Sequence, residues 1–208
     1  MRRLLVMIAL LLAFSPVAVI AQDAASDEAV ERTNVRLLLP FGPDGLNGDL
    51  AEVAAVNGNC AIDSLHVPAR GEAWECIGDD DTVYDPCFEN PYGAADAPGV
   101  LACVESPFST DVVMLALDEP LVRDKESPAD AIHDPWNLPW ALELANGEQC
   151  VLLSDIELVL AGLSVYYNCS QGGSVLGDLN RGGDVWTVSY AAPDAIGSSL
   201  VDVVTAWS

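Results

Sequence analysis

Residues 140–153 read WALELANGEQCVLL, and this stretch carries the clearest fold signal in the chain. Asn146-Gly147 favours a two-residue type I′ turn, because both residues tolerate positive φ. That turn predicts a β-hairpin in which Glu143 pairs with Cys150, and it leaves Cys150 on the face opposite to the core. The core face of the hairpin would consist of Trp140, Leu142, Leu144, Val151 and Leu153.

The rest of the chain shows short apolar runs separated by Gly, Pro, Asn and Asp, with little sustained helical periodicity. This pattern is typical of an antiparallel β protein. It predicts a mainly β fold with at most short helical turns, either an antiparallel β-sandwich or a partly open barrel. Asn57-Gly58 is expected to end one strand before the next begins. The strands expected besides the hairpin are residues 35–39, 50–56, 61–67, 99–104, 112–117, 164–169, 174–179, 184–190 and 200–207.

The N-terminus has the features of an export signal. Arg2 and Arg3 precede an apolar run from Leu4 to Phe14, and small or β-branched residues favour cleavage after residue 21. An uncleaved membrane anchor is the alternative, but the apolar run is short for a spanning helix, which needs about 20 residues. We therefore expect a signal peptide at 1–21, a secreted or extracytoplasmic product, and no membrane span after cleavage.

Beyond the signal, residues 22–33 are acidic, rich in alanine and without periodicity, so they predict a flexible arm. Residues 34–208 are predicted to form a single disulfide-stabilised β domain. The proline-containing segment 123–137 divides the cysteines four and two. We interpret it as a long loop within that domain, with a linker between subdomains as the alternative.

The chain is strongly acidic, with 32 Asp and Glu residues against eight Lys and Arg residues and a formal net charge of −24. Such a charge repels the phosphates of nucleic acids and anionic lipids, so neither is an expected partner. A solvated acidic surface, cation binding and life in high salt all fit this composition. The hydrophobic content of 51% is enough to form a core.

Six cysteines follow the signal, an even number in a chain expected to meet an oxidising compartment. Six cysteines allow 15 pairings, and sequence alone does not select among them. Short sequence separations favour sequential pairing, with bridges between neighbouring strands. A zinc site is the competing interpretation, but the close cysteine pairs that such sites use are absent. The predicted disulfides are Cys60–Cys76, Cys87–Cys103 and Cys150–Cys169.

Several cysteine-containing segments resemble a group of uncharacterised secreted or envelope proteins of actinobacteria and related bacteria. The resemblance is carried by AWEC at 73–76, by YDPCF at 84–88, by Cys103 and by PWALELANG at 139–147. In those proteins a tryptophan often follows the first cysteine, where this chain has Ala61. The resemblance implies a bacterial extracytoplasmic domain of unknown function, and it transfers no catalytic residue.

No motif of a known catalytic site occurs in the sequence, which lacks Gly-x-Ser-x-Gly, His-Glu-x-x-His and the phosphate-binding glycine loops. A non-catalytic binding or cell-envelope module, with an unknown ligand or envelope component as its partner, is therefore the leading interpretation. The alternative is an extracellular hydrolase that uses His66 or His133 with nearby carboxylates or a serine.

One acidic cluster is a candidate cation site. Asp79, Asp80, Asp81 and Asp85 lie close together in the sequence, and calcium takes six to eight oxygen ligands that loop carboxylates supply readily. Their spacing does not match an EF-hand. A solvated acidic turn is the alternative, and Ca²⁺ is the one cofactor that the sequence suggests.

Aromatic residues gather near the cysteines and the loops. They can belong to the core or form a platform on which a sugar or peptide stacks. The residues concerned are Trp74, Tyr84, Phe88, Tyr92, Phe108, Trp136 and Trp140.

Overall fold

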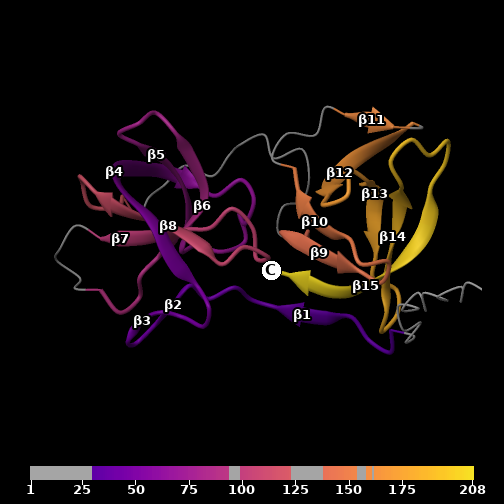
Figure 1. Ribbon diagram of the computed structural model, residues 1–208, viewed down its shortest axis with the longest axis horizontal. Coiled ribbons are helices and arrows are strands. Elements are labelled where there is room, and N and C mark those ends of the chain that lie inside the picture. Colours follow the sequence, from indigo (N-terminus) through magenta and orange to yellow (C-terminus); the bar gives the residue numbers. More distant parts are fainter. Residues whose placement is uncertain (1–29, 94–98, 123–137, 154–157, 161) are drawn as a thin grey trace, which may run out of the picture.

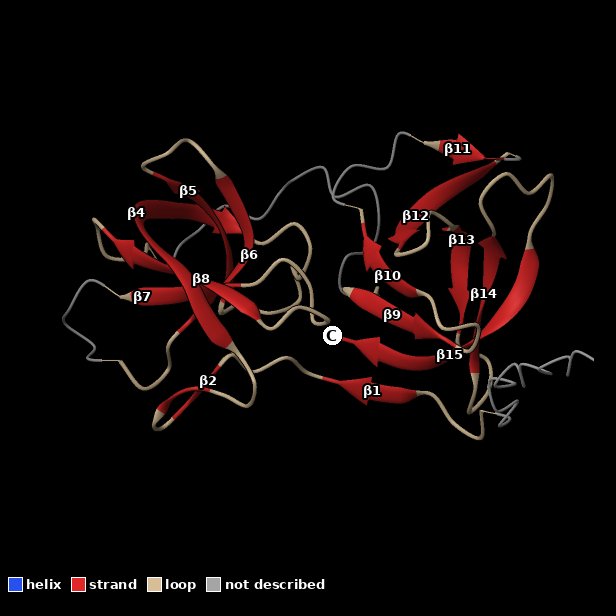
Figure 2. Cartoon of the chain, in the orientation of Figure 1, coloured by secondary structure: helices blue, strands red, loops and turns tan. Residues whose placement is uncertain are grey.

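The structure is a computed structural model, and it describes residues 30–93, 99–122, 138–153, 158–160 and 162–208. These residues form 15 strands and no helix, arranged as two small closed β-barrels (Figures 1 and 2). Among them, no helix is long and apolar enough to cross a membrane. The prediction of a mainly β fold is confirmed. The predicted signal peptide and segment 123–137 lie outside the described residues.

The first barrel is closed by five strands in the order β4-β5-β6-β7-β8. β4 pairs with β8 in parallel, and the other neighbouring pairs are antiparallel. A hairpin of β2 and β3 packs on this barrel, where Phe41 contacts a cluster that contains Val104 and Val112. The strands are β2 (Phe41–Gly42), β3 (Gly45–Leu46), β4 (Ala51–Asp63), β5 (Ala73–Gly78), β6 (Val83–Glu89), β7 (Val100–Cys103) and β8 (Asp111–Leu117).

The second barrel is closed because β15 pairs with β9, at the other end of the order β15-β14-β13-β12-β10-β9. β1 extends this sheet in parallel with β15, and β11 pairs with β12. The core contains Leu142, Tyr167 and Val203, all with side chains almost fully buried. The strands are β1 (Asn34–Arg36), β9 (Ala141–Leu144), β10 (Gln149–Leu152), β11 (Val159–Leu160), β12 (Leu163–Cys169), β13 (Ser174–Asn180), β14 (Trp186–Ala191) and β15 (Ser199–Trp207).

The three disulfides join consecutive cysteines, as the sequence predicts. Each bridge also joins two residues that lie directly opposite each other on paired antiparallel strands. Two bridges are in the first barrel and one is in the second. The bridges are Cys60–Cys76, Cys87–Cys103 and Cys150–Cys169.

The hairpin of residues 140–153 forms, but its predicted register is wrong by one residue. Cys150 pairs with Leu142, and the loop spans three residues because Leu144 donates to the carbonyl of Glu148. Gly147 has a φ of 84°, whereas Asn146 is not among the residues with positive φ, so the type I′ turn does not form. Cys150 therefore shares a face with Leu142 and lies in the core of the second barrel.

The predicted strand end at Asn57-Gly58 is also wrong, because both residues lie inside β4, a continuous strand from Ala51 to Asp63. Gly58 does not form a turn; it allows the neighbouring strand β5 to approach β4 closely. A Cβ atom at Gly58 would clash with the backbone carbonyl of Ile77 on β5. The missing side chain thus lets β5 begin its pairing with β4 at this point.

The two barrels contact each other through a small apolar cluster. Trp140, the residue before β9, packs against Phe88 of β6 with ring centroids 6.0 Å apart, and both side chains are buried. Arg70 lies over the Phe88 ring at 4.6 Å and donates to the carbonyl of Leu38 in the segment that joins the barrels. That the whole of residues 34–208 behaves as one domain stays a prediction.

Candidate functional site

His66 lies in the segment between β4 and β5, beside Asp85 of β6. Its Nδ1 atom is 3.2 Å from Asp85 Oδ2, and the Asp85 side chain is only 6% exposed. The Asp85 carboxylate also accepts hydrogen bonds from the Ser64 hydroxyl and, at 2.9 Å, from the Leu65 N–H. The Ser64 hydroxyl in turn accepts a 2.9 Å hydrogen bond from the Val67 N–H. Asp85 therefore fixes the backbone of this segment against β6.

These contacts differ from the relay of a serine hydrolase. In that relay the histidine lies between the serine and the carboxylate, which accepts the Nδ1–H proton. Here Ser64 donates to Asp85 instead, and the Ser64 side chain is fully buried. The Nδ1 atom of His66 is buried without an aligned hydrogen-bond partner, although Asp85 is close. These contacts hold the 64–67 segment in place, and they do not activate a serine nucleophile. The other candidate histidine, His133, lies outside the described residues.

Glu75 on β5 belongs to the same electrostatic environment. Burial raises the pKa of its carboxyl, the charge of Asp85 raises it further, and the charge of His66 opposes both effects. A raised pKa keeps more of the Glu75 carboxyl protonated than that of an ordinary surface glutamate, and a general acid needs this state. Ser64 and Glu75 are the groups in this cluster that the sequence did not single out.

The acidic turn between β5 and β6 is organised by Asp80. Its carboxylate accepts hydrogen bonds from the Thr82 N–H at 3.0 Å and from the Tyr84 hydroxyl at 3.2 Å. The hydrogen bond from the Thr82 backbone is the main cause that lowers the pKa of Asp80. The carboxylate therefore caps the turn from within the chain.

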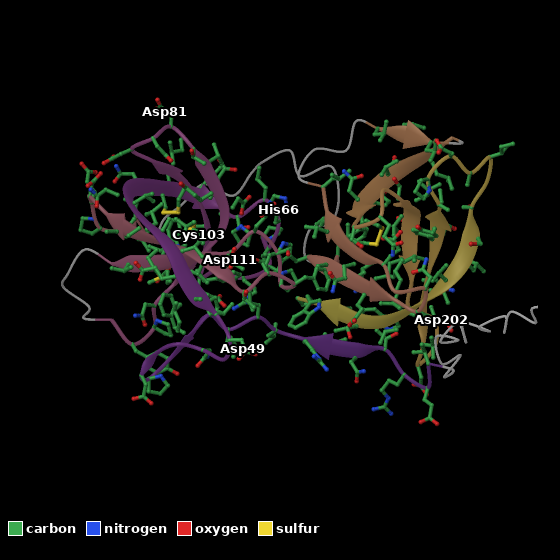
Figure 3. The ribbon with its side chains drawn as sticks, in the orientation of Figure 1. Asp49, His66, Asp81, Cys103, Asp111 and Asp202 are labelled. Carbon is green, nitrogen blue, oxygen red and sulfur yellow. A yellow bond between two sulfur atoms is a disulfide. The ribbon has the colours of Figure 1, made fainter. Side chains whose placement is uncertain are left out.

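The four residues predicted to bind Ca²⁺ do not converge on one point. Asp79, Asp80 and Asp81 lie in the exposed turn, and Figure 3 shows Asp81 at the tip of the first barrel, well away from His66. The Asp85 carboxylate is instead held by the segment around His66. Within the described ranges, no group of three or more His, Cys, Asp or Glu residues is arranged to hold a metal ion. The calcium site stays a prediction that this geometry does not support.

A groove of about 510 Å³ opens at the end of the first barrel where β4, β6 and β8 begin. Its lining includes Cys103, the last residue of β7, and Asp111, the first residue of β8, and Figure 3 labels both. Two exposed valines also line it, Val53 on β4 at 58% and Val83 on β6 at 57%. The volume falls in the range of about 300–1,000 Å³ that is usual for ligand pockets.

The groove combines apolar contact with negative charge. Val104 and Val113 add to its apolar lining, while Glu105 and Asp111 contribute exposed carboxylates. Asp85 also lines the groove, but its carboxylate is already hydrogen-bonded. Such a surface suits a ligand that carries both an apolar part and a positive charge.

Three of the seven aromatic candidates belong to the core. Trp74, Phe88 and Trp140 are buried, and the Trp74 indole N–H donates to Glu89 at 2.8 Å. Tyr84 lines the groove, so it is available to a ligand at that site. Trp136 lies outside the described residues. The buried rings support the core interpretation over an aromatic platform for sugars.

Sequence reasoning missed the groove, because its residues come from four segments that meet only after the barrel closes. Val53 and Val113 look like ordinary strand valines in the sequence.

Comparison of the chain with models of protein families, with curated proteins and with solved structures finds no match to any of them. The chemistry of the chain must therefore be judged from its own geometry. The three disulfides indicate an oxidising, extracytoplasmic environment, because such bridges persist where thiols are not kept reduced.

Proposed function

We propose that this protein is a secreted, non-catalytic binding module whose ligand occupies the groove at the end of the first barrel. The groove itself carries the proposal, because it combines ligand-sized volume, exposed valines and exposed carboxylates. Its walls are strands that two disulfides hold in register, so the site is preformed. A preformed site reduces the entropy lost on binding.

Secretion is supported by two independent features. The first is the N-terminal pattern of Arg2, Arg3 and the apolar run up to Phe14, which predicts a cleaved export signal. The second is that all six cysteines are paired. The resemblance to secreted bacterial proteins agrees with this placement, and a cell-envelope component is the partner class that it suggests.

A groove-filling substitution tests the binding function. Val53→Trp places an indole at a position that is already exposed, and Val100→Trp does the same on β7 outside the groove. Both variants and the parent protein would be screened against arrayed cell-wall glycans and displayed random peptides. We expect ligands that bind the parent and Val100→Trp, and that lose at least tenfold affinity for Val53→Trp. Ligands that bind all three proteins equally would place the site elsewhere.

The hydrolase remains a second candidate because His66 Nδ1 lies 3.2 Å from Asp85 and because Glu75 has a raised pKa. If this cluster were catalytic, His66→Ala and Glu75→Gln would abolish the hydrolysis of ester, peptide or glycoside substrates without unfolding the protein. The binding module predicts that neither substitution changes any turnover by the purified protein. Turnover that disappears in both variants would replace the binding function with the hydrolytic one.

A further inference from the structure

The first half of β4 is unusual for a strand in a closed barrel. Residues 51–55 are all exposed, and β8 pairs with β4 along one edge from Ala51 to Gly58. On the opposite edge, β5 pairs with β4 only from Gly58 onward. One residue earlier, the Asn57 carbonyl accepts a hydrogen bond from the N–H of Asp79, which follows β5. Among the strand pairings of the described residues, none occupies that edge between Ala51 and Val56.

The direction of the backbone groups shows which residues face this open edge. The Gly58 carbonyl accepts from Asp118, which follows β8, whereas the Asn57 carbonyl accepts from Asp79, on the β5 side. Because successive residues of a strand direct their hydrogen-bonding groups to alternate edges, Ala55 faces the same side as Asn57. The register is regular between Ala55 and Gly58, so the N–H and carbonyl of Ala55 are offered to the open edge.

Natural proteins usually protect such edges with lysine, proline or a covering segment, because an open edge recruits another strand. Residues 51–56 read AEVAAV, without lysine or proline; the register with β8 shifts at Val53 and is regular from Ala54 onward. Val53 in this segment lines the groove, so the open edge and the groove form one continuous surface. An extended chain laid along β4 would therefore place alternate side chains into the groove.

The charge of this surface limits what can lie there. Glu52 is on the strand itself, and Glu105 and Asp111 line the adjoining groove. Arg70 is the only lysine or arginine between residues 41 and 122, and Glu72 holds its guanidinium at 2.7 Å. An occupant with basic side chains is thus favoured over a neutral or acidic one.

We propose that β4 accepts an extended, lysine- or arginine-bearing segment of another protein as an added strand. The segment pairs through its backbone with β4 around Ala55 and directs its apolar side chains into the groove, beside Val53 and Val113. Its alternate side chains are basic and interact with the acidic surface that Glu52, Glu105 and Asp111 create. This inference rests on the proposed binding function and specifies its ligand class and binding mode.

The test uses a ten-residue peptide of alternating lysine and valine with blocked ends, titrated calorimetrically into the full protein. An added strand uses the N–H groups of every second residue only. We therefore compare two N-methylated peptides, one methylated at all lysines and one at all valines, which keep the same side chains. We expect one of them to lose at least tenfold affinity while the other binds within threefold of the parent peptide.

The protein is varied in parallel. Glu105→Gln with Asp111→Asn should weaken the peptide about tenfold and reduce the dependence of its affinity on salt, because surface charges are screened over about 10 Å at 0.1 M ionic strength. Ala55→Pro should remove a donor from the open edge while sparing the pairing with β8. The N-methylated peptides keep the test valid even if Ala55→Pro fails to fold.

Equal affinity of the two N-methylated peptides would overturn strand addition, since only side chains would then matter. Strand addition would also be overturned if the lysine–valine peptide failed to bind while the screen found glycans or other peptides whose binding depends on Val53. That result would leave the binding function intact. The absence of any Val53-dependent ligand would overturn both proposals.

Discussion

Glu148 offers the sharpest test of how the second barrel is stabilised. Its side chain is buried at the end of the hairpin loop between β9 and β10, with 3% of the residue exposed. The carboxylate accepts hydrogen bonds from the Tyr190 hydroxyl at 2.5 Å, the Gln171 N–H at 2.9 Å and the Ser170 hydroxyl at 3.0 Å. Glu148 thus links this loop to the turn after β12 and to β14.

The cost of losing this carboxylate follows from those three bonds. Hydrogen bonds to a charged group contribute about 1.5–3 kcal/mol each, and part of that sum offsets the desolvation of the carboxylate. We expect Glu148→Ala to lower the free energy of unfolding by about 4 kcal/mol, in the range seen when one partner of a buried polar network is removed. Glu148→Gln keeps one acceptor oxygen and should cost about 2 kcal/mol.

The pH dependence gives an independent check. Burial tends to raise the pKa of Glu148, but the hydrogen bonds from Tyr190, Gln171 and Ser170 outweigh it and lower the pKa. A group whose pKa is lower in the folded state stabilises the protein above its unfolded pKa, and this stabilisation is lost as the pH falls. The stability gap between the parent protein and Glu148→Gln should therefore be largest near pH 7 and shrink below pH ~4.

The assay is urea unfolding with intact disulfides, followed by tryptophan fluorescence at several pH values. Glu143→Gln is the matched control at a half-buried position on the same hairpin, and it should stay within about 1 kcal/mol of the parent, the typical effect of a single substitution. The reasoning is refuted if Glu148→Gln matches this control at neutral pH. It is also refuted if the gap stays constant as the pH falls, because the carboxylate charge would then contribute nothing.

Three further predictions concern the first barrel and the contact between the barrels. Arg70→Met should lower the free energy of unfolding by about 2 kcal/mol in denaturant titration, because it frees the Leu38 carbonyl. Trp140→Ala should lower the free energy of unfolding by about 3–5 kcal/mol. If residues 34–208 are one cooperative domain, the parent protein should show a single calorimetric transition and the variant two. Two transitions in the parent protein would contradict the prediction of one domain. Replacing Cys87 and Cys103 together by alanine should cost about 3 kcal/mol in thermal unfolding, given their separation of 16 residues.

Local patterns predicted the fold class, most of the strands and all three disulfides. The cysteine pairing could be predicted because each bridge joins neighbouring antiparallel strands that a short connection brings together. β6 was harder to recognise, since Pro86 interrupts its pattern and proline is usually excluded from central strands. Barrel closure depends on pairings between distant segments, such as β15 with β9, that no local pattern encodes.

The errors of register also have a physical origin. A two-residue turn at Asn146-Gly147 was plausible from residue preferences, but it would have moved Cys150 out of the core and away from Cys169. The three-residue loop keeps the disulfide buried, so tertiary packing decided the turn. The groove had no comparable local signal, and its acidic residues could not be told apart from the other acids in so acidic a chain.

The arrangement of the disulfides affects how the chain can oxidise. Each bridge joins a cysteine to the next cysteine along the chain. If the chain meets an oxidant gradually, N-terminus first, the two cysteines of each native pair therefore become available one after the other. Cys60 can bond to Cys76 before Cys87 is available, and the same order holds for the later pairs. Under the secretion proposed above, the chain would complete its oxidative folding as it is exported, with no mispaired bridges for an isomerase to rearrange, and a reduced full-length chain would lack this advantage.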